Sequence, residues 1–300
     1  MKLKSIFILF ALVAIIFGGC NNTTNPVNTT PVPNPPSGLD ATSIDNVTVK
    51  IHWVPSTSAK DSTFKDYVVD IGPGVFQSIS VVKTDSVCTI NGLTEGTVYT
   101  FTVHSRNTDN VESTAGVTVQ WSPATRFTQT VNAVPIRVYE TASPSGSGLQ
   151  FYDATVNGPQ VLNVADGAKW NLALDTRNNA LIFGSPSQIN YNYTGTPPVT
   201  QISTDNFWDT NTLDNIYDSQ ALSAKNFSET TIDLNNLGTV PTQGLAFIAR
   251  TNATSNTAVW NYAKVLIIKG PVGLFNGNPP NRYIEVWISY QKVAGVPYAM

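Results

Sequence analysis

The sequence has 300 residues, of which 12% are charged, and its formal net charge at pH 7 is −3. So few charges exclude the clustered basic patch that nucleic-acid binding requires, and we expect no nucleic-acid partner. The remaining polarity comes largely from Asn, Thr, Ser and Gly beside many aromatic and β-branched residues, a composition that favours strands over helices.

The N-terminus has the order of a secretory signal. Lys2 and Lys4 precede an apolar run over residues 5–17, and Gly18 and Gly19 follow it. A positive start, a short apolar stretch and small residues before the cleavage site define such a signal. The run is shorter than the roughly 20 residues that a membrane-spanning helix needs. We therefore expect residues 1–19 to be a removed signal peptide.

The cysteine after this run adds a membrane anchor. Residues 17–20, Phe-Gly-Gly-Cys, resemble a bacterial lipobox, although Phe17 stands where that motif usually has Leu. The resemblance implies that Cys20 is lipidated and that the protein is held by its lipid at the bacterial outer membrane or cell surface. Two or more acyl chains give stable anchoring. Ordinary secretion, with a cysteine near the cleavage site by chance, is the alternative.

The residues after the lipobox predict a tether, and the cysteine count predicts that Cys88 is unpaired. Residues 20–35 are rich in Asn, Thr and Pro, carry no charge and offer little to bury, so we expect a disordered tether. The chain has only two cysteines. If Cys20 carries lipid, Cys88 has no disulfide partner, and we expect it to be a small buried apolar residue.

Residues 36–122 have the pattern of a first β domain. Turn residues such as Gly72-Pro73-Gly74 and Asn91-Gly92 separate short alternating segments. The expected strands are residues 47–53, 66–72, 78–84, 86–92, 98–105 and 117–121. Many short strands with regular turns predict an antiparallel sandwich.

Anchor residues in this stretch resemble a fibronectin type III domain. Trp53 and Tyr67 occupy successive strands, and Tyr99 follows Leu93 by six residues. The resemblance implies that Trp53 fills the core between two sheets. It also implies that Tyr99 is the corner tyrosine whose hydroxyl bonds a backbone group.

Both histidines of the chain, His52 and His104, lie in this first domain. Neighbouring strand residues face opposite sides, so His52 should lie on the surface if Trp53 is in the core. Two surface histidines without a third ligand make a poor metal site, and we expect no metal site.

Residues 127–300 form a second unit with a β pattern. A polar stretch over residues 185–241 interrupts the pattern, and the strongest strand signals follow near the end. Three segments, residues 169–174, 262–267 and 283–291, resemble strands of the HmuY-like haem-binding lipoproteins. The resemblance implies an all-β fold that holds haem between two long strand-loop fingers. The whole chain is thus expected to be all-β, with a sandwich followed by a larger antiparallel domain.

The sequence departs from that family at the haem ligands. No histidine follows His104, and Met300 is the only methionine besides Met1. Tyr191, Tyr193 and Tyr217 are the candidate oxygen ligands for a haem iron, which tyrosine can hold. Since Asn190-Tyr191-Asn192-Tyr193 also reads as a plain strand, haem remains a possible cofactor only.

The polar stretch also holds aromatic residues among carboxylates. Trp208 stands beside Phe207, and the Asp residues nearby are Asp205, Asp209, Asp214 and Asp218. Such a group binds sugars or flat ligands, or it simply packs a loop on a sheet with a solvated acidic rim. Trp208 therefore joins the three tyrosines as a candidate ligand-binding residue.

No catalytic residue is predicted. The sequence has no nucleophile elbow, phosphate loop or zinc motif, and the second domain lacks histidine. We expect a non-enzymatic binding protein: either an HmuY-like module for haem, or a structural or adhesive protein that binds a surface protein or glycan with the first domain as spacer.

Overall fold

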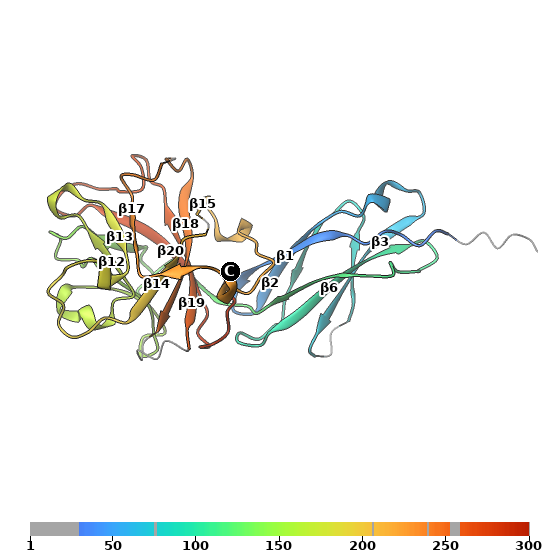
Figure 1. Cartoon of the computed structure of the whole chain (residues 1–300), viewed down its shortest axis with the longest axis horizontal. Helices are drawn as coiled ribbons and strands as arrows, with labels where there is room; N and C mark the ends of the chain where they lie inside the picture. Colours follow the sequence, from blue (N-terminus) through green and yellow to red (C-terminus); the bar gives the residue numbers. More distant parts are fainter. Residues whose placement is uncertain (1–29, 75–76, 206, 239, 253–258, 300) are drawn as a thin grey trace, which may run out of the picture.

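The computed structural model describes residues 30–74, 77–205, 207–238, 240–252 and 259–299. The predicted signal peptide, Cys20 and most of the predicted tether lie outside these residues. Two β bodies lie end to end and give the molecule an elongated shape (Figure 1). Within the described ranges, no helix is long and apolar enough to cross a membrane.

The first domain is a sandwich of two antiparallel sheets, one of three strands and one of four. The smaller sheet has the order β1-β2-β5, and the larger has the order β4-β3-β6-β7. Their strands are β1 (Ser37–Asp45), β2 (Thr48–Val54), β3 (Phe64–Gly72), β4 (Ile79–Val82), β5 (Val87–Ile90), β6 (Tyr99–Asn107) and β7 (Val117–Trp121), with a 3₁₀ turn, η1 (Thr57–Lys60), between β2 and β3.

Strand alternation builds the core of this domain as expected. Trp53 and Tyr67 have no exposed surface, and their rings meet edge to face with centroids 5.3 Å apart. The Tyr99 hydroxyl accepts a hydrogen bond from the Thr94 amide at 3.0 Å, which confirms the corner tyrosine. Cys88 is buried and makes no disulfide, and burial raises the pKa of its thiol to about 11.

The second domain, which comprises β8–β20, also has two antiparallel sheets. The smaller has the order β11-β10-β12-β13-β17. The larger has the order β16-β14-β18-β19-β20-β8, and β15 pairs with β18 while β9 pairs with β20.

The strands of the second domain are β8 (Thr125–Phe127), β9 (Ile136–Tyr139), β10 (Gly148–Asp153), β11 (Gly158–Leu162), β12 (Leu172–Asp175), β13 (Ile182–Gly184), β14 (Val199–Ser203), β15 (Trp208–Asp209), β16 (Phe227–Ser228), β17 (Thr231–Asp233), β18 (Gly244–Asn252), β19 (Asn261–Ile268) and β20 (Tyr283–Tyr290). Its 3₁₀ turns are η2 (Val164–Lys169), η3 (Arg177–Asn179), η4 (Pro186–Gln188), η5 (Leu213–Asn215) and η6 (Leu222–Ala224). The all-β expectation is confirmed for both domains.

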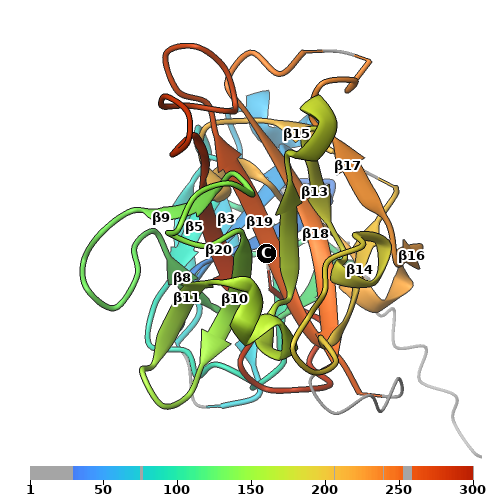
Figure 2. The same ribbon diagram turned by 90° about the vertical axis from the view of Figure 1, so that its left-hand side faces the viewer.

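The larger sheet of the second domain is buried on both faces. One face packs on the smaller sheet, where Phe247 and Val265 meet Phe151 and Phe183 from β10 and β13. Figure 2 shows these layers from the outer end of the second domain. The opposite face packs against the first domain and the segment that contains η5 and η6. Burial on both faces explains why β18 and β19 are almost continuously apolar instead of alternating.

A shared core joins the two domains. Trp121, the last residue of β7, has no exposed surface, and its ring lies 5.0 Å from that of Tyr298. Only three residues separate β7 from β8, which pairs directly with β20 of the second domain. The first domain therefore passes into the large sheet without a flexible linker.

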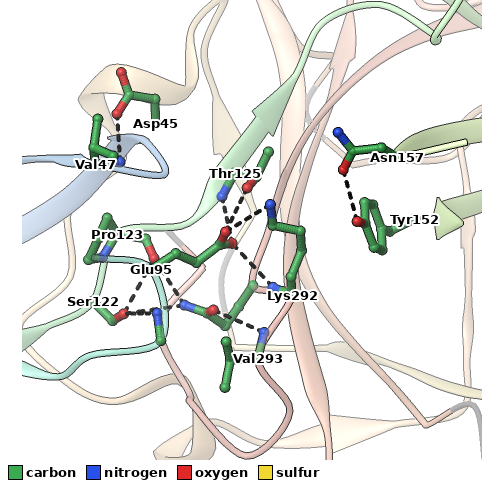
Figure 3. Close-up of polar contacts among 12 residues, drawn as sticks. Asp45, Val47, Glu95, Ser122, Pro123, Thr125, Tyr152, Asn157, Lys292 and Val293 are labelled. Atoms are coloured by element: carbon green, nitrogen blue, oxygen red, sulfur yellow. Dashed lines mark hydrogen bonds and ion pairs between the residues drawn. The ribbon is translucent and has the colours of Figure 1, made fainter. Parts of the chain in front are cut away.

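Polar contacts surround this shared core. The Glu95 carboxylate accepts hydrogen bonds from the Thr125 amide and hydroxyl and forms an ion pair with Lys292 at 3.0 Å (Figure 3). The Gln291 amide, which is fully buried, donates to the carbonyls of Pro123 and Tyr298 at 3.1 and 3.0 Å. These bonds connect the first domain, the segment after it and the C-terminal segment in a single orientation.

Candidate functional site

A cleft opens at one edge of the sandwich of the second domain. It has a volume of about 540 Å³ and lies between β17 of the smaller sheet and β15 and β18 of the larger one. Its apolar lining includes Phe207, Ile232, Leu237, Pro241 and Leu245. Phe207 is the notable side chain, since 47% of its surface is exposed. A volume in this range suits a small ligand.

Asp209 fixes the loop that closes one side of the cleft. Its carboxylate accepts hydrogen bonds from the Thr242 hydroxyl and amide at 2.7 and 2.9 Å, and from the Gln243 amide at 2.7 Å. These donors hold the pKa of Asp209 well below its usual range, with the Thr242 hydroxyl as the main cause. The carboxylate thus positions the segment that follows Pro241, and its lone pairs are largely used.

Trp208 lies between the cleft and the core that joins the two domains. It lines the cleft beside Phe207, and it is partly buried against the core that joins the domains. This position follows from the pairing of Trp208 with Ala246, because Ala246 faces the first domain. Phe207, and not Trp208, is therefore the better exposed aromatic of the pair.

Tyr191 and Tyr193 lie elsewhere, at an opening of about 590 Å³ beside η4. The rings of both tyrosines meet Trp170 edge to face, with centroids 5.6 and 5.5 Å from that of the tryptophan. The Tyr191 hydroxyl donates to the Leu174 carbonyl at 2.7 Å and lies 2.8 Å from the Thr141 hydroxyl. Ligation of an iron by Tyr191 would break this arrangement.

Burial works against ionisation of both phenols. It raises the pKa of Tyr191 and of Tyr193, and for Tyr193 the neighbouring Tyr191 adds to the effect. The Tyr193 hydroxyl donates to the Pro186 carbonyl at 3.2 Å. A tyrosine that binds iron does so as the phenolate, so this environment favours structural roles for both rings.

Tyr217 lies at the junction of the domains. Its ring centroid is 5.4 Å from that of His52, and the Lys50 ammonium lies 5.3 Å from the same ring. The next residue, Asp218, pairs its backbone with Ala41 of β1. The four predicted ligand-binding residues thus occupy three places: the cleft, the opening beside η4, and the junction.

Sequence reasoning missed Lys264, the most unusual polar residue of the junction. Its side chain has no exposed surface, and its ammonium donates to the Thr42 hydroxyl and to the Leu213 and Ile216 carbonyls at 3.3, 3.1 and 3.2 Å. The signal was present, since Lys264 is a single cation within the apolar run of β19. Strand alternation places it, with Tyr262 and Leu266, on the face toward the first domain.

Comparison with known proteins identifies the first domain alone. The family model of the fibronectin type III domain matches residues 34–115. No curated protein matches the chain. Solved structures to which the chain is similar include the fibronectin type III domain of the human collagen alpha-1(XX) chain (21% identity, 33% of this chain and 92% of that chain, TM-score 0.27). They also include the fibronectin type III domain of human fibronectin type III domain containing protein 3 (17%, 33% and 93%, 0.28) and the rat CD45 extracellular region, domains d3-d4 (11%, 40% and 83%, 0.27).

The family match agrees with the sandwich of β1–β7, the buried Trp53 and the hydrogen-bonded hydroxyl of Tyr99. Residues 34–115 form a fibronectin type III domain.

Proposed function

We propose that this chain is an extracytoplasmic lipoprotein that holds a glycan-binding β domain away from a bacterial membrane. In this proposal, Cys20 carries the lipid, the fibronectin type III domain is a rigid spacer, and the cleft beside Phe207 receives the ligand. The location is the outer membrane or the cell surface. The protein is a non-catalytic binding module.

One observation carries the spacer role. The first described segment, blue in Figure 1, lies at the end of the first domain that is remote from the second. There the carbonyls of Thr30 and Pro31 accept hydrogen bonds from Asn107, at the end of β6. At the other end of the domain, the shared core with Trp121 and Tyr298 fixes the second domain. An anchor before residue 30 would therefore place the second domain, with its cleft, on the side of the first domain that faces away from the membrane.

The ligand class follows from the lining of the cleft. An exposed aromatic ring beside hydroxyl and amide groups can stack on a sugar ring while the polar groups bond its hydroxyls. Phe207 supplies the ring here, and Thr230, Thr231 and Asn236 supply polar groups. The HmuY-like resemblance makes haem the competing ligand.

The anchor is tested by fractionation. Wild-type protein should remain with the membranes of the expressing bacterium, and Cys20→Ser should move to the soluble fraction. Mass spectrometry of the N-terminal peptide should show an acylated cysteine. An unmodified thiol at Cys20 in membrane-extracted protein would refute the lipoprotein proposal.

The ligand is tested with panels of bacterial surface oligosaccharides and with haem. We expect saturable oligosaccharide binding that Phe207→Ala weakens at least about tenfold, or 1.4 kcal/mol, and that Phe207→Tyr retains. Val272→Ala, which truncates a side chain 88% exposed outside the cleft, is the matched control. A Soret band that titrates with haem, together with no oligosaccharide binding, would replace the glycan proposal with the haem alternative.

A further inference from the structure

The first domain brings three possible metal ligands together on its outer surface. On β6, residues with buried side chains alternate with residues on the outer face, and His104 belongs to the outer set. Val68 of β3 pairs with His104, and Asp70, two residues further along β3, lies on the same face. Glu112 follows β6 and returns to pair with Arg106.

The donor atoms are close enough to share one ion. One ligand atom from each of Asp70, His104 and Glu112 lies within 4.8 Å of the other two. A tetrahedral zinc ion with bonds of about 2.0–2.2 Å requires donor separations of about 3.4 Å. The donor atoms must therefore move closer to one another by at most about 1.4 Å to reach this separation. The exposed Glu112 side chain has the rotational freedom to do this.

Two features hold the histidine and the aspartate in place. A Cβ atom at Gly116 would lie 2.7 Å from Cε1 and Nε2 of His104, so the ring occupies space that only glycine leaves open. The Asp70 carboxylate accepts a hydrogen bond from the Ser78 hydroxyl at 2.5 Å. Hydrogen bonds of this kind to a ligating carboxylate are typical of metal sites.

The polar groups of the cluster are not fully used by the protein itself. Nδ1 of His104 is shielded from solvent, and the structure, over the residues it describes, gives it no hydrogen-bond partner. The nearby guanidinium of Arg106 is committed to Asp66 through two bonds of 2.8 and 2.7 Å, and to the Ser80 hydroxyl at 2.8 Å. The Arg106 guanidinium therefore has Asp66 and Ser80, and not Glu112, as its hydrogen-bond partners in the described part of the chain.

We propose that Asp70, His104 and Glu112 bind one divalent transition-metal ion, best matched by zinc. One imidazole nitrogen and two carboxylates are ligands that zinc accepts, whereas magnesium and calcium prefer oxygen donors alone. Three protein ligands leave a fourth position for water or for a donor from another molecule. The sequence led us to expect no metal site, because we considered only the two histidines as ligands and not the carboxylates of Asp70 and Glu112.

The test is calorimetric titration of the metal-stripped full chain in detergent with zinc chloride, with magnesium chloride as comparison. We expect one zinc ion per chain and no saturable magnesium binding. His104→Ala and Glu112→Gln should each weaken zinc binding at least about tenfold. The matched control is His52→Ala, because His52 is the only other histidine of the chain and lies outside the cluster.

A second measurement separates ligation from folding. Zinc should raise the thermal midpoint of the wild type but not that of Glu112→Gln, whose exposed side chain can change without disturbing the core. X-ray absorption of the zinc-loaded protein should show one imidazole in the first coordination shell. The proposal is overturned by the absence of saturable zinc binding, by equal weakening in His52→Ala, or by binding that His104→Ala leaves unchanged.

Discussion

Replacement of Lys264 by methionine tests how the junction holds a buried cation. Burial lowers the pKa of Lys264 well below 10.5, and the cation of Arg126 adds to the effect. The two nearest carboxylates oppose the shift but have other partners: Asp214 is paired with Arg126, and Asp218 lies 2.6 Å from Lys225. Lys264 should thus lose its proton more easily in the folded chain than in the unfolded chain.

The sign and size of the effect follow from proton linkage. In the pH range just below 10.5, the unfolded chain holds a proton on Lys264 that the folded chain has released. The free energy of unfolding therefore rises with pH in this range and falls as the pH is lowered toward the folded-state pKa. One proton corresponds to a slope of up to about 1.4 kcal/mol per pH unit. Lys264→Met removes this slope.

The assay is equilibrium urea unfolding at pH 8, 9 and 10, followed by tryptophan fluorescence. The difference between wild type and Lys264→Met should change with pH by this slope, while titrations common to both proteins cancel. The Leu213 and Ile216 carbonyls lose a donor in the variant, which adds an offset that pH does not change. Lys83→Met, at an exposed lysine, is the control. Parallel pH profiles would refute the reasoning and show that the three oxygen partners keep Lys264 charged.

Three further substitutions test the interior of both domains. Glu140→Gln should cost about 1–3 kcal/mol, because the buried carboxylate accepts from the Arg282 amide, Nε and Nη2 at 2.8, 3.1 and 2.7 Å. The Arg282 guanidinium lowers the pKa of Glu140, so the loss should shrink as the pH falls below 4.5 and the wild type itself loses this stabilisation. Gly148→Ala should cost about 3 kcal/mol or more, since its Cβ would lie 1.9 Å from the Trp170 ring. Tyr99→Phe should cost about 1–2 kcal/mol by leaving a backbone amide without its acceptor.

Urea unfolding midpoints and calorimetry measure all three effects. A Glu140→Gln profile that stays parallel to the wild type in acid would contradict the assigned pKa direction. The control for Gly148→Ala is Gly72→Ala, where an added Cβ meets nothing within 4 Å. If the two alanine variants were equally stable, the close packing of Trp170 on β10 would not be the constraint. An unchanged midpoint in Tyr99→Phe would show that water replaces the phenol.

The sequence predicted the first domain well because most of its strands bury one face. Trp53, Tyr67 and Tyr99 lie where the alternation and the family resemblance placed them. The bounds of β1 (Ser37–Asp45) were not predicted, because its middle residues are small or polar and yet buried. Thr42 and Ser43 bond the second domain and the segment that leads to it, and no local pattern reveals such partners.

The candidate site was harder to predict, because its residues are arranged by long-range pairing. Trp208 and Tyr217 are nine positions apart in sequence, yet one pairs with β18 and the other lies against His52. A single helix or strand over both residues would have kept a fixed spacing, but this segment consists of the two-residue strand β15, the 3₁₀ turn η5 and irregular backbone. Likewise, the cluster of Asp70, His104 and Glu112 depends on the register of β3 with β6, which the sequence alone does not give.

Both faces of the large sheet of the second domain are covered, so expression of that domain without the first domain should change its surface. A second domain produced alone would lose the part of its cover that the first domain supplies, including the Trp121 ring against Tyr298 and the Thr42 hydroxyl beside Lys264. Apolar patches uncovered in this way promote self-association. We therefore expect the two domains to be produced best as one chain, because each covers part of the other's buried surface.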